Sequence, residues 1–267
     1  MIDVMIVSLR PGRITPYTFR SVLKQPEVSS VIVVTPTDEM DEFARSFESD
    51  KIVVVREPPN FCLAWARRLG VNYAKSKYVC YVDDDVILGD GFFKPFLKKA
   101  EELEKQYPAF GIEGIMHLMQ YGSDKPILYK EQFLKPGDRG FTHNTLLLRE
   151  SLLSWRPIYT FAWEDWHLTQ HIFSLGGVWL RMKTPVVTYH YHSYATWKRQ
   201  AWNTAGERMV KGLGLRPFFR RAIRLTYVLV RQIFTKRSYA TLVNNSHRLR
   251  GYVVGYLKCG TYLNRPA

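Results

Sequence analysis

Cysteine is scarce in this chain. The 267 residues include only three, Cys62, Cys80 and Cys259, and no two of them form a C-x-x-C pair. The sequence therefore suggests neither a disulfide framework nor a cysteine-based zinc site. The sequence also lacks an apolar run of the roughly 20 residues that span a bilayer, and its start lacks the charged region and cleavage site of a signal peptide. These absences predict a protein of the reducing cytoplasm.

Acidic residues are almost missing from the last quarter of the chain. Residues 193–267 hold 15 of the 38 Lys and Arg residues but only one of the 24 acids, Glu207, so this segment carries the whole net charge of +14. Residues 1–192 hold 23 charges of each sign and are neutral. Such a change in charge predicts a boundary between a neutral body and a basic extension over residues 196–267.

Apolar residues, in contrast, make up 46% of the chain, which is enough for a sizeable core. Short apolar runs predict strands at 4–9, 30–35, 51–55, 78–82, 112–119, 145–149, 179–182 and 186–192. Amphipathic patterns between them predict helices at 38–47, 61–75 and 164–177. Continuous Val and Ile runs that alternate with helices indicate a buried, mainly parallel sheet with helices on both faces. Such sheets bind ligands beyond the carboxyl ends of their strands.

Three consecutive aspartates, Asp83, Asp84 and Asp85, follow the apolar run at 78–82. Adjacent carboxylates repel one another and are costly to bury. An acidic surface turn is one explanation. A divalent cation is the other, because Mg²⁺ and Mn²⁺ take a few carboxylates and complete their shell with water and phosphate oxygens. Two carboxylates in a D-x-D arrangement can hold such a metal, which neutralises a diphosphate leaving group.

The stretch PPNFCLAWARRLGVNYAKSKYVCYVDDDV resembles family 2 glycosyltransferases with the GT-A fold. Their pattern is an N-x-G-L-x-x-A-R-N-x-G helix and then an apolar strand that ends in D-x-D. The chain matches it at Asn60, Leu63, Ala66, Arg67, Gly70 and the aspartates, and departs from it at Cys62 and Arg68. A second stretch, AWEDWHLTQHIFSLGG, resembles the acidic pair that opens a later helix in this family. The resemblance extends over residues 1–195.

This resemblance implies a GT-A, Rossmann-like, three-layer α/β/α sandwich with a mainly parallel mixed sheet. Residues 1–100 would form its nucleotide-sugar-binding half and residues 101–195 its acceptor-binding half. The helical basic extension at 196–267 would follow. The implied activity is a metal-dependent, inverting sugar transfer of the hexosyltransferase type, from a nucleotide-sugar donor to a glycan or lipid-linked acceptor.

The donor side is expected around the aspartates. The resemblance implies that Asp85 binds Mn²⁺ or Mg²⁺, that Asp83 contacts the metal or the ribose, and that Arg67 braces the aspartate loop or the diphosphate. The other donor-binding candidates are Asp84, Ser8, Arg10 and Thr35. Thr35 stands where the family often has an aspartate that binds uracil, so the sequence leaves the choice of nucleotide open.

The acceptor side is expected around Glu164 and Asp165. An inverting transfer needs a base for the acceptor hydroxyl, and the resemblance gives that role to Asp165, with Glu164 positioning the acceptor. Two acids favoured by the helix dipole are the alternative. The remaining acceptor candidates are Trp163 and Trp166, which suit stacking on a sugar or core packing equally, and His143. A third metal ligand is expected at His190, with His192 as the alternative.

The basic extension contains an amphipathic helical pattern at 216–234, with Arg220, Arg221, Arg224 and Arg231 on one face. This pattern predicts a peripheral association with an anionic membrane surface, at the inner face of the cell membrane. Packing of the apolar face on the body is the alternative, and nucleic acid is a less favoured partner. For the whole chain, the competing functions are a nucleotidyltransferase, which would release pyrophosphate, and a catalytically inactive membrane- or nucleic-acid-binding module.

Overall fold

The computed structural model describes residues 1–58, 62–114, 117–120, 130–158, 160, 162–183, 188–192, 197–212, 214–234 and 239–257. The chain forms two compact units. The first contains Met1–Ile158 and Asp165–His192, and the second contains Tyr159–Glu164 and Ser193–Ala267. The inclusion of residues 159–164 in the second unit had no signal in the sequence.

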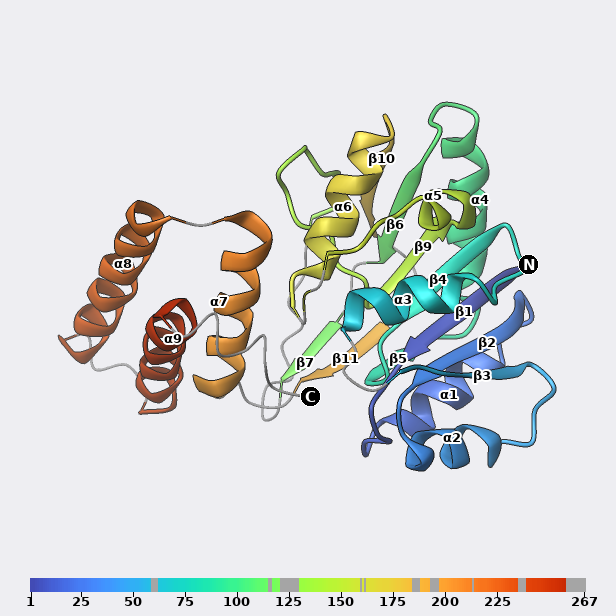
Figure 1. Ribbon diagram of the computed structural model, residues 1–267, viewed down its shortest axis with the longest axis horizontal. Helices are drawn as coiled ribbons and strands as arrows, with labels where there is room; N and C mark the ends of the chain where they lie inside the picture. The colour runs from blue at the N-terminus through green and yellow to red at the C-terminus, as the bar shows by residue number, and fades with distance from the viewer. Residues whose placement is uncertain are drawn as a thin grey trace. The chain divides into compact units, whose positions relative to one another are not determined.

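The first unit is built on an eight-stranded sheet in the order β3-β2-β1-β4-β9-β6-β10-β8 (Figure 1). Its strands are β1 (Ile2–Val7), β2 (Val28–Thr35), β3 (Ile52–Arg56), β4 (Tyr78–Val82), β6 (Phe110–Gly114), β8 (Gln132–Phe133), β9 (Asn144–Leu148) and β10 (Val178–Met182). Strands β8 and β9 pair antiparallel to their neighbours, and the other pairs are parallel. The predicted mainly parallel mixed sheet is confirmed.

Helices cover both faces of this sheet. One core contains side chains of α1 (Thr15–Leu23), α2 (Asp38–Arg45) and α4 (Phe93–Glu104). The core on the other face contains side chains of α3 (Leu63–Val71), α5 (Arg149–Leu153) and α6 (Glu164–Ser174). Local sequence supports these helices. For example, Thr37 caps α2 by accepting a hydrogen bond from the Met40 N–H at 3.4 Å. The three-layer α/β/α prediction is confirmed.

After the aspartates, the chain enters a second, smaller sheet. It consists of β5 (Val86–Leu88), β11 (Thr188–His192) and β7 (His117–Gln120), in the order β5-β11-β7. The single strand predicted at 112–119 is therefore two strands, β6 and β7, which belong to different sheets. In β11, the backbone of His190 lies opposite Val86, the residue that follows the three aspartates.

The second unit is helical, which confirms the predicted helical extension. It contains α7 (Trp197–Lys211), α8 (Leu215–Phe234) and α9 (Tyr239–Leu257). Helices α7 and α9 cross closely at Gly255, where an added Cβ would lie 2.0 Å from the Ala201 carbonyl oxygen. Phe218 of α8 stacks on Tyr252 and Tyr256 of α9, with ring centroids 5.5 and 4.0 Å apart. Across the described ranges, every helix is too short or too polar to cross a membrane.

Candidate active site

The three aspartates lie in a turn at the carboxyl end of β4, a central strand with β1 and β9 on either side. The Asp83 N–H donates to the His143 carbonyl at 3.1 Å, and the Asp83 carbonyl accepts from the Val86 N–H at 3.1 Å. The turn is therefore fixed at both ends by the backbone. All three side chains are partly exposed, as a ligand-binding position at the edge of the sheet requires.

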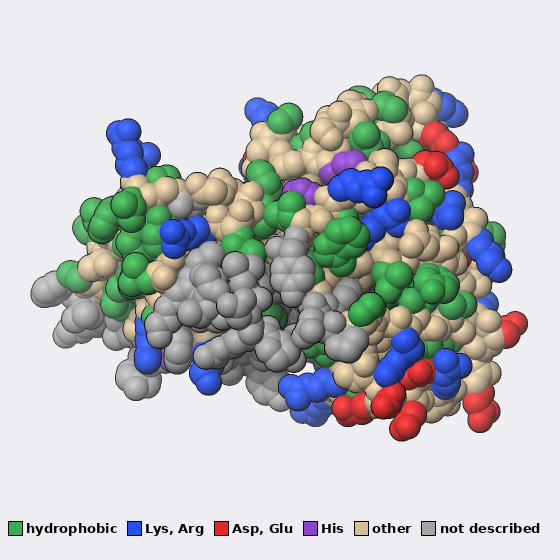
Figure 2. All heavy atoms as spheres, in the orientation of Figure 1, with side chains coloured by type: hydrophobic (Ala, Val, Ile, Leu, Met, Phe, Trp, Pro, Cys, Tyr) green, Lys and Arg blue, Asp and Glu red, His purple; other side chains and the backbone are tan. Residues whose placement is uncertain are grey.

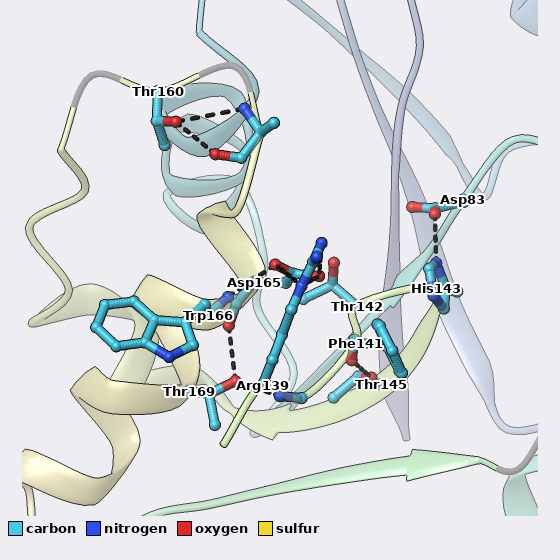
Figure 3. Close-up of polar contacts among 12 residues, drawn as sticks. Asp83, Arg139, Phe141, Thr142, His143, Thr145, Thr160, Asp165, Trp166 and Thr169 are labelled. Carbon is cyan, nitrogen blue, oxygen red and sulfur yellow. Dashed lines mark hydrogen bonds and ion pairs between the residues drawn. The ribbon is translucent and has the colours of Figure 1, made fainter. Parts of the chain in front are cut away.

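Asp83 is held between two cationic or protonatable side chains. Its Oδ1 accepts a hydrogen bond from Arg67 Nη2 at 3.0 Å. Its Oδ2 lies 2.9 Å from His143 Nδ1, a contact that Figure 3 shows. The Arg67 side chain is buried, hydrogen-bonds the Thr142 hydroxyl, and lies over the Tyr81 ring at 5.3 Å. Arg67 therefore contacts the aspartate loop, and its expected role toward a donor diphosphate stays a prediction. His143 contacts this loop too, and its expected contact with an acceptor stays a prediction.

Asp84 contacts the end of β1 and helix α1. Its carboxylate accepts a hydrogen bond from the Ser8 hydroxyl, and its carbonyl accepts one from the Thr18 hydroxyl of α1 at 3.1 Å. Burial raises the pKa of Asp84 to about 6, the Ser8 hydrogen bond opposes this shift, and the charges of Asp85 and Asp83 add to it. Asp84 thus ties the end of β1 to the aspartate loop, while Asp83 and Asp85 remain the candidates for metal and donor.

Two donor-binding candidates, Arg10 after β1 and Thr35 at the end of β2, differ in their exposure to solvent. Arg10 is exposed. Thr35 is fully buried, with its hydroxyl 3.3 Å from that of Thr37, which in turn donates to the Leu9 carbonyl at 2.6 Å. Thr35 therefore supports the loop that follows β1 through Thr37. A direct contact of Thr35 with a nucleobase stays a prediction.

Glu57, which sequence analysis missed, follows β3. Its side chain is only 6% exposed, and no described residue hydrogen-bonds to its carboxylate. Its backbone N–H donates to the Thr35 carbonyl at 3.2 Å, which fixes it beside the end of β2. Burial raises the pKa of Glu57 to about 8, so the side chain is mainly protonated at neutral pH. An acid directly before Pro58 was the only signal in the sequence.

Asp165, at the start of α6, is bound by an arginine that sequence analysis also missed. Arg139 Nε lies 2.8 Å from Oδ1 and 2.9 Å from Oδ2 of Asp165, and Arg139 Nη2 lies 2.8 Å from Oδ2 (Figure 3). The Trp166 N–H donates to Oδ1 at 2.7 Å. Asp165 is 3% exposed. A two-point guanidinium contact holds a carboxylate in one orientation.

One five-residue segment, residues 139–143, connects the two acidic sites. Its first residue binds Asp165 and its last contacts Asp83, as Figure 3 shows. Four steps between Cα atoms extend at most about 14 Å. The segment therefore links Asp83 and Asp165 through the side chains at its two ends, although these acids are 82 positions apart in the sequence.

Buried groups hold this segment in place. Glu113 accepts hydrogen bonds from the Phe141 N–H at 2.6 Å, from Trp179 Nε1 at 2.7 Å and from Arg181. Thr169 of α6 accepts one from the Gly140 N–H at 3.1 Å. Only glycine fits at position 140, because an added Cβ would lie 2.2 Å from the Trp179 ring. Glu113, in the middle of β6, gave no functional signal in the sequence.

The remaining acceptor candidates surround the start of α6. Trp163 has a φ of +68°, a left-handed conformation that is strained for a bulky residue. Its ring lies 4.3 Å from Lys211 Nζ. Trp166 donates from its indole nitrogen to the Gly137 carbonyl at 3.1 Å, and Glu164 is buried. The roles of these residues toward an acceptor stay predictions.

The expected metal ligands are only partly described. The side chains of His190 and His192 lie outside the described residues, as does Asn60 of the helix motif. Among the side chains that the structure describes, no three His, Cys, Asp or Glu residues form a group that could hold a metal ion. The carboxylates of Asp83 and Asp85 are nevertheless hard oxygen donors of the kind that suits Mg²⁺ or Mn²⁺, which need only one or two of them.

Comparison with known structures identifies similar folds. S. aureus TarS superimposes with a TM-score of 0.53 at 13% identity, over 76% of this chain and 38% of TarS. GalNAc-T7, solved with UDP, GalNAc and Mn²⁺, gives 0.54 at 14% identity, over 78% of this chain and 47% of GalNAc-T7. TarS 1-349 in complex with UDP-GlcNAc gives 0.52 at 11% identity, over 98% and 92%. This chain therefore spans less than half of the longer TarS chain and of the GalNAc-T7 chain.

Comparison of sequences identifies a family. No curated protein matches the chain. The sequence model described as glycosyl transferase family 2 matches residues 4–143, which is more than half of the chain. The matched region begins in β1 and ends at His143, so it includes Arg67 and His143, the two side chains described above at Asp83. Together with the GT-A fold of the similar structures, this match shows that the chain belongs to glycosyl transferase family 2.

Proposed function

We propose that the protein is a metal-dependent, inverting glycosyltransferase that moves a sugar from a nucleoside-diphosphate sugar to an acceptor hydroxyl or a lipid phosphate. The observation that carries this proposal is the 139–143 segment, which contacts Asp83 at one end and Asp165 at the other. A sugar transfer needs two such groups, one at the leaving diphosphate and one at the attacking oxygen.

On the donor side, Asp85 and Asp83 are the residues proposed to hold Mn²⁺ or Mg²⁺, with His190 as a third ligand. The bound cation would neutralise the charge that develops on the diphosphate. Arg67 keeps Asp83 oriented, and Ser8 keeps the end of β1 against the loop. A UDP sugar is the first donor to test, because TarS and GalNAc-T7 were solved with UDP-GlcNAc and with UDP and GalNAc respectively.

On the acceptor side, Asp165 is the proposed base. Both of its oxygens already accept hydrogen bonds, from Arg139 and from the Trp166 N–H. An acceptor hydroxyl must therefore replace one of these donors before it can transfer its proton to Asp165. Arg139 is the donor proposed to move aside, because its side chain is partly exposed, whereas the Trp166 N–H is fixed in the helix backbone. A lipid phosphate acceptor arrives ionised and would need no base.

The test is incubation with a panel of nucleotide sugars and Mn²⁺, with a glycan or lipid-phosphate acceptor present. Release of a nucleoside diphosphate, together with an inverted anomeric configuration in the product, supports the proposal. Release of pyrophosphate would identify a nucleotidyltransferase instead. Retention of configuration would exclude the single-displacement scheme, and no turnover of any donor would favour a binding module.

A further inference from the structure

The second unit contains a groove lined by arginine. Helices α7, α8 and α9 border a groove of about 980 Å³, and five of the side chains around it are arginines: Arg216, Arg220, Arg221, Arg224 and Arg248. The remaining lining is neutral, with Thr204 and Asn245 among the polar groups. Guanidinium groups bind phosphate through paired N–H donors, so this groove has the chemistry of a phosphate site.

Most of this positive charge is not neutralised within the unit. Glu207, the only acid after residue 192, is buried and accepts from Arg221 Nη1 at 2.6 Å. Arg221 also lies over the Tyr252 ring at 4.9 Å, so it forms a fixed wall of the groove. Within the described ranges, the other four arginines form no ion pair. They are exposed and available to an anion.

An apolar stripe runs along α8 beside the groove. We define the stripe as Leu215, Phe219, Ile223, Tyr227 and Val230, whose spacings of four, four, four and three residues place them on one side of the helix. They are 44% to 67% exposed. Figure 2 shows hydrophobic side chains gathered over α8, with basic side chains next to them. Core packing does not explain the stripe, because α8 packs through another side that includes the buried Phe218.

The order around α8 relates the stripe to the groove. At about 100° per residue, Arg220 and Arg224 each follow a stripe residue, so they line the side of the groove that is next to the stripe. A ligand that fits both surfaces has a phosphate group joined to a hydrocarbon region. Nucleic acid would supply the phosphates but has no hydrocarbon region that would cover the exposed Leu, Ile and Val side chains.

We propose that the second unit binds the surface of an anionic lipid bilayer, with lipid phosphates in the arginine groove and the apolar stripe in the boundary between headgroups and acyl chains. This inference is independent of the sugar-transfer chemistry. Helices of this kind lie in the interface rather than crossing it. Each basic residue near an anionic surface contributes about 1 kcal/mol.

The test is co-sedimentation of the full chain with vesicles of phosphatidylcholine alone and of equal parts phosphatidylcholine and phosphatidylglycerol. A groove variant changes Arg216, Arg220, Arg224 and Arg248 to Gln, and a stripe variant carries Phe219→Ser and Ile223→Ser. A matched control changes four exposed lysines of the first unit to Gln: Lys94, Lys98, Lys105 and Lys130. Thermal unfolding checks that each variant is folded.

We expect the wild type and the lysine control to prefer anionic vesicles. The groove variant should lose that preference, with a fall in affinity of up to about 10³-fold for four charges, and the stripe variant should bind both vesicles more weakly. Equal binding of the wild type to both vesicles, or an unchanged preference in the groove variant, would overturn the proposal. So would binding of pyrophosphate or of an RNA oligonucleotide through the same arginines without any binding to vesicles.

Discussion

Arg139 binds both carboxylate oxygens of Asp165: its Nε lies 2.8 Å from Oδ1 and 2.9 Å from Oδ2. The pair joins the loop before β9 to the first turn of α6. Because of this pair, the proposed base, Asp165, already accepts hydrogen bonds before an acceptor binds. If an acceptor hydroxyl replaces Arg139, the Trp166 N–H still sets the orientation of the Asp165 carboxylate.

Asp165→Asn should therefore lower turnover with a hydroxyl acceptor by roughly 10² to 10⁴-fold, the usual contribution of a general base. Affinity for the donor should change little, because Asp83 and Arg67 are untouched. Steady-state turnover and calorimetric binding of UDP measure the two effects separately. Asp50→Asn, at an exposed position, is the control for loss of one carboxylate. A variant that keeps full turnover would remove Asp165 from the mechanism.

Asp85 and Asp84 should respond differently to substitution although they are adjacent. Asp85→Ala should abolish manganese-dependent binding of UDP, because it removes a proposed ligand. Asp84→Asn should keep that dependence, since asparagine can still accept the Ser8 hydrogen bond. Calorimetry of UDP with Mn²⁺ and with a chelator tests both variants. Equal loss of the manganese effect in the two variants would contradict the different roles given to these residues.

Glu57 should make the protein less stable as the pH rises. Its pKa is about 8 in the folded chain, against an ordinary value of 4.5. Between these values the folded state binds more protons than the unfolded state, so the free energy of unfolding falls with increasing pH, by at most about 1.4 kcal/mol per pH unit. Urea unfolding at pH 5.5 and pH 7.5 should show this fall in wild type and a smaller one in Glu57→Gln. Identical pH slopes would mean that Glu57 is not buried as described.

Gly255→Ala should destabilise the second unit by about 1 to 3 kcal/mol, the usual cost of overpacking. Its Cβ would meet the backbone of α7, which cannot move aside as a side chain can. Gly214→Ala is the matched control, because an added Cβ at that position has no neighbour within 4 Å. Thermal unfolding followed by circular dichroism compares the two. Equal unfolding temperatures would contradict the close crossing of α7 and α9.

The sequence was sufficient to predict the sheet and the aspartate loop, because both depend on local patterns. Continuous Val and Ile runs identify buried strands, and Arg67 and the aspartates belong to one contiguous motif. Arg139, Glu113 and Glu57 were missed for a physical reason. Arg139 and Glu113 bind partners distant in the sequence, as when Arg139 binds a residue 26 positions away. Glu57 is buried only by the folded chain, and no described residue hydrogen-bonds to its carboxylate. No periodicity reports such contacts or such burial.

The same limit applies to α8. Its hydrophobic periodicity predicted an amphipathic helix, and the helix exists. Periodicity alone did not separate Phe218, which is 7% exposed and packs on α9, from its neighbour Phe219, which is 56% exposed. Only the fold of the second unit divides the apolar residues of α8 into a packed side and an exposed side.

The assignment of residues 159–164 to the helical unit has a practical consequence for protein engineering. Deleting the chain after residue 192 would not remove a self-contained module. It would leave Ala162 without Gly206, whose Cα approaches it too closely for a side chain, and Trp163 without Lys211. The segment left behind, residues 159–164, immediately precedes Asp165. Loss of activity in a shortened protein would therefore not show that the extension takes part in catalysis. Point substitutions on the surface of the intact chain are the sounder way to separate the two units.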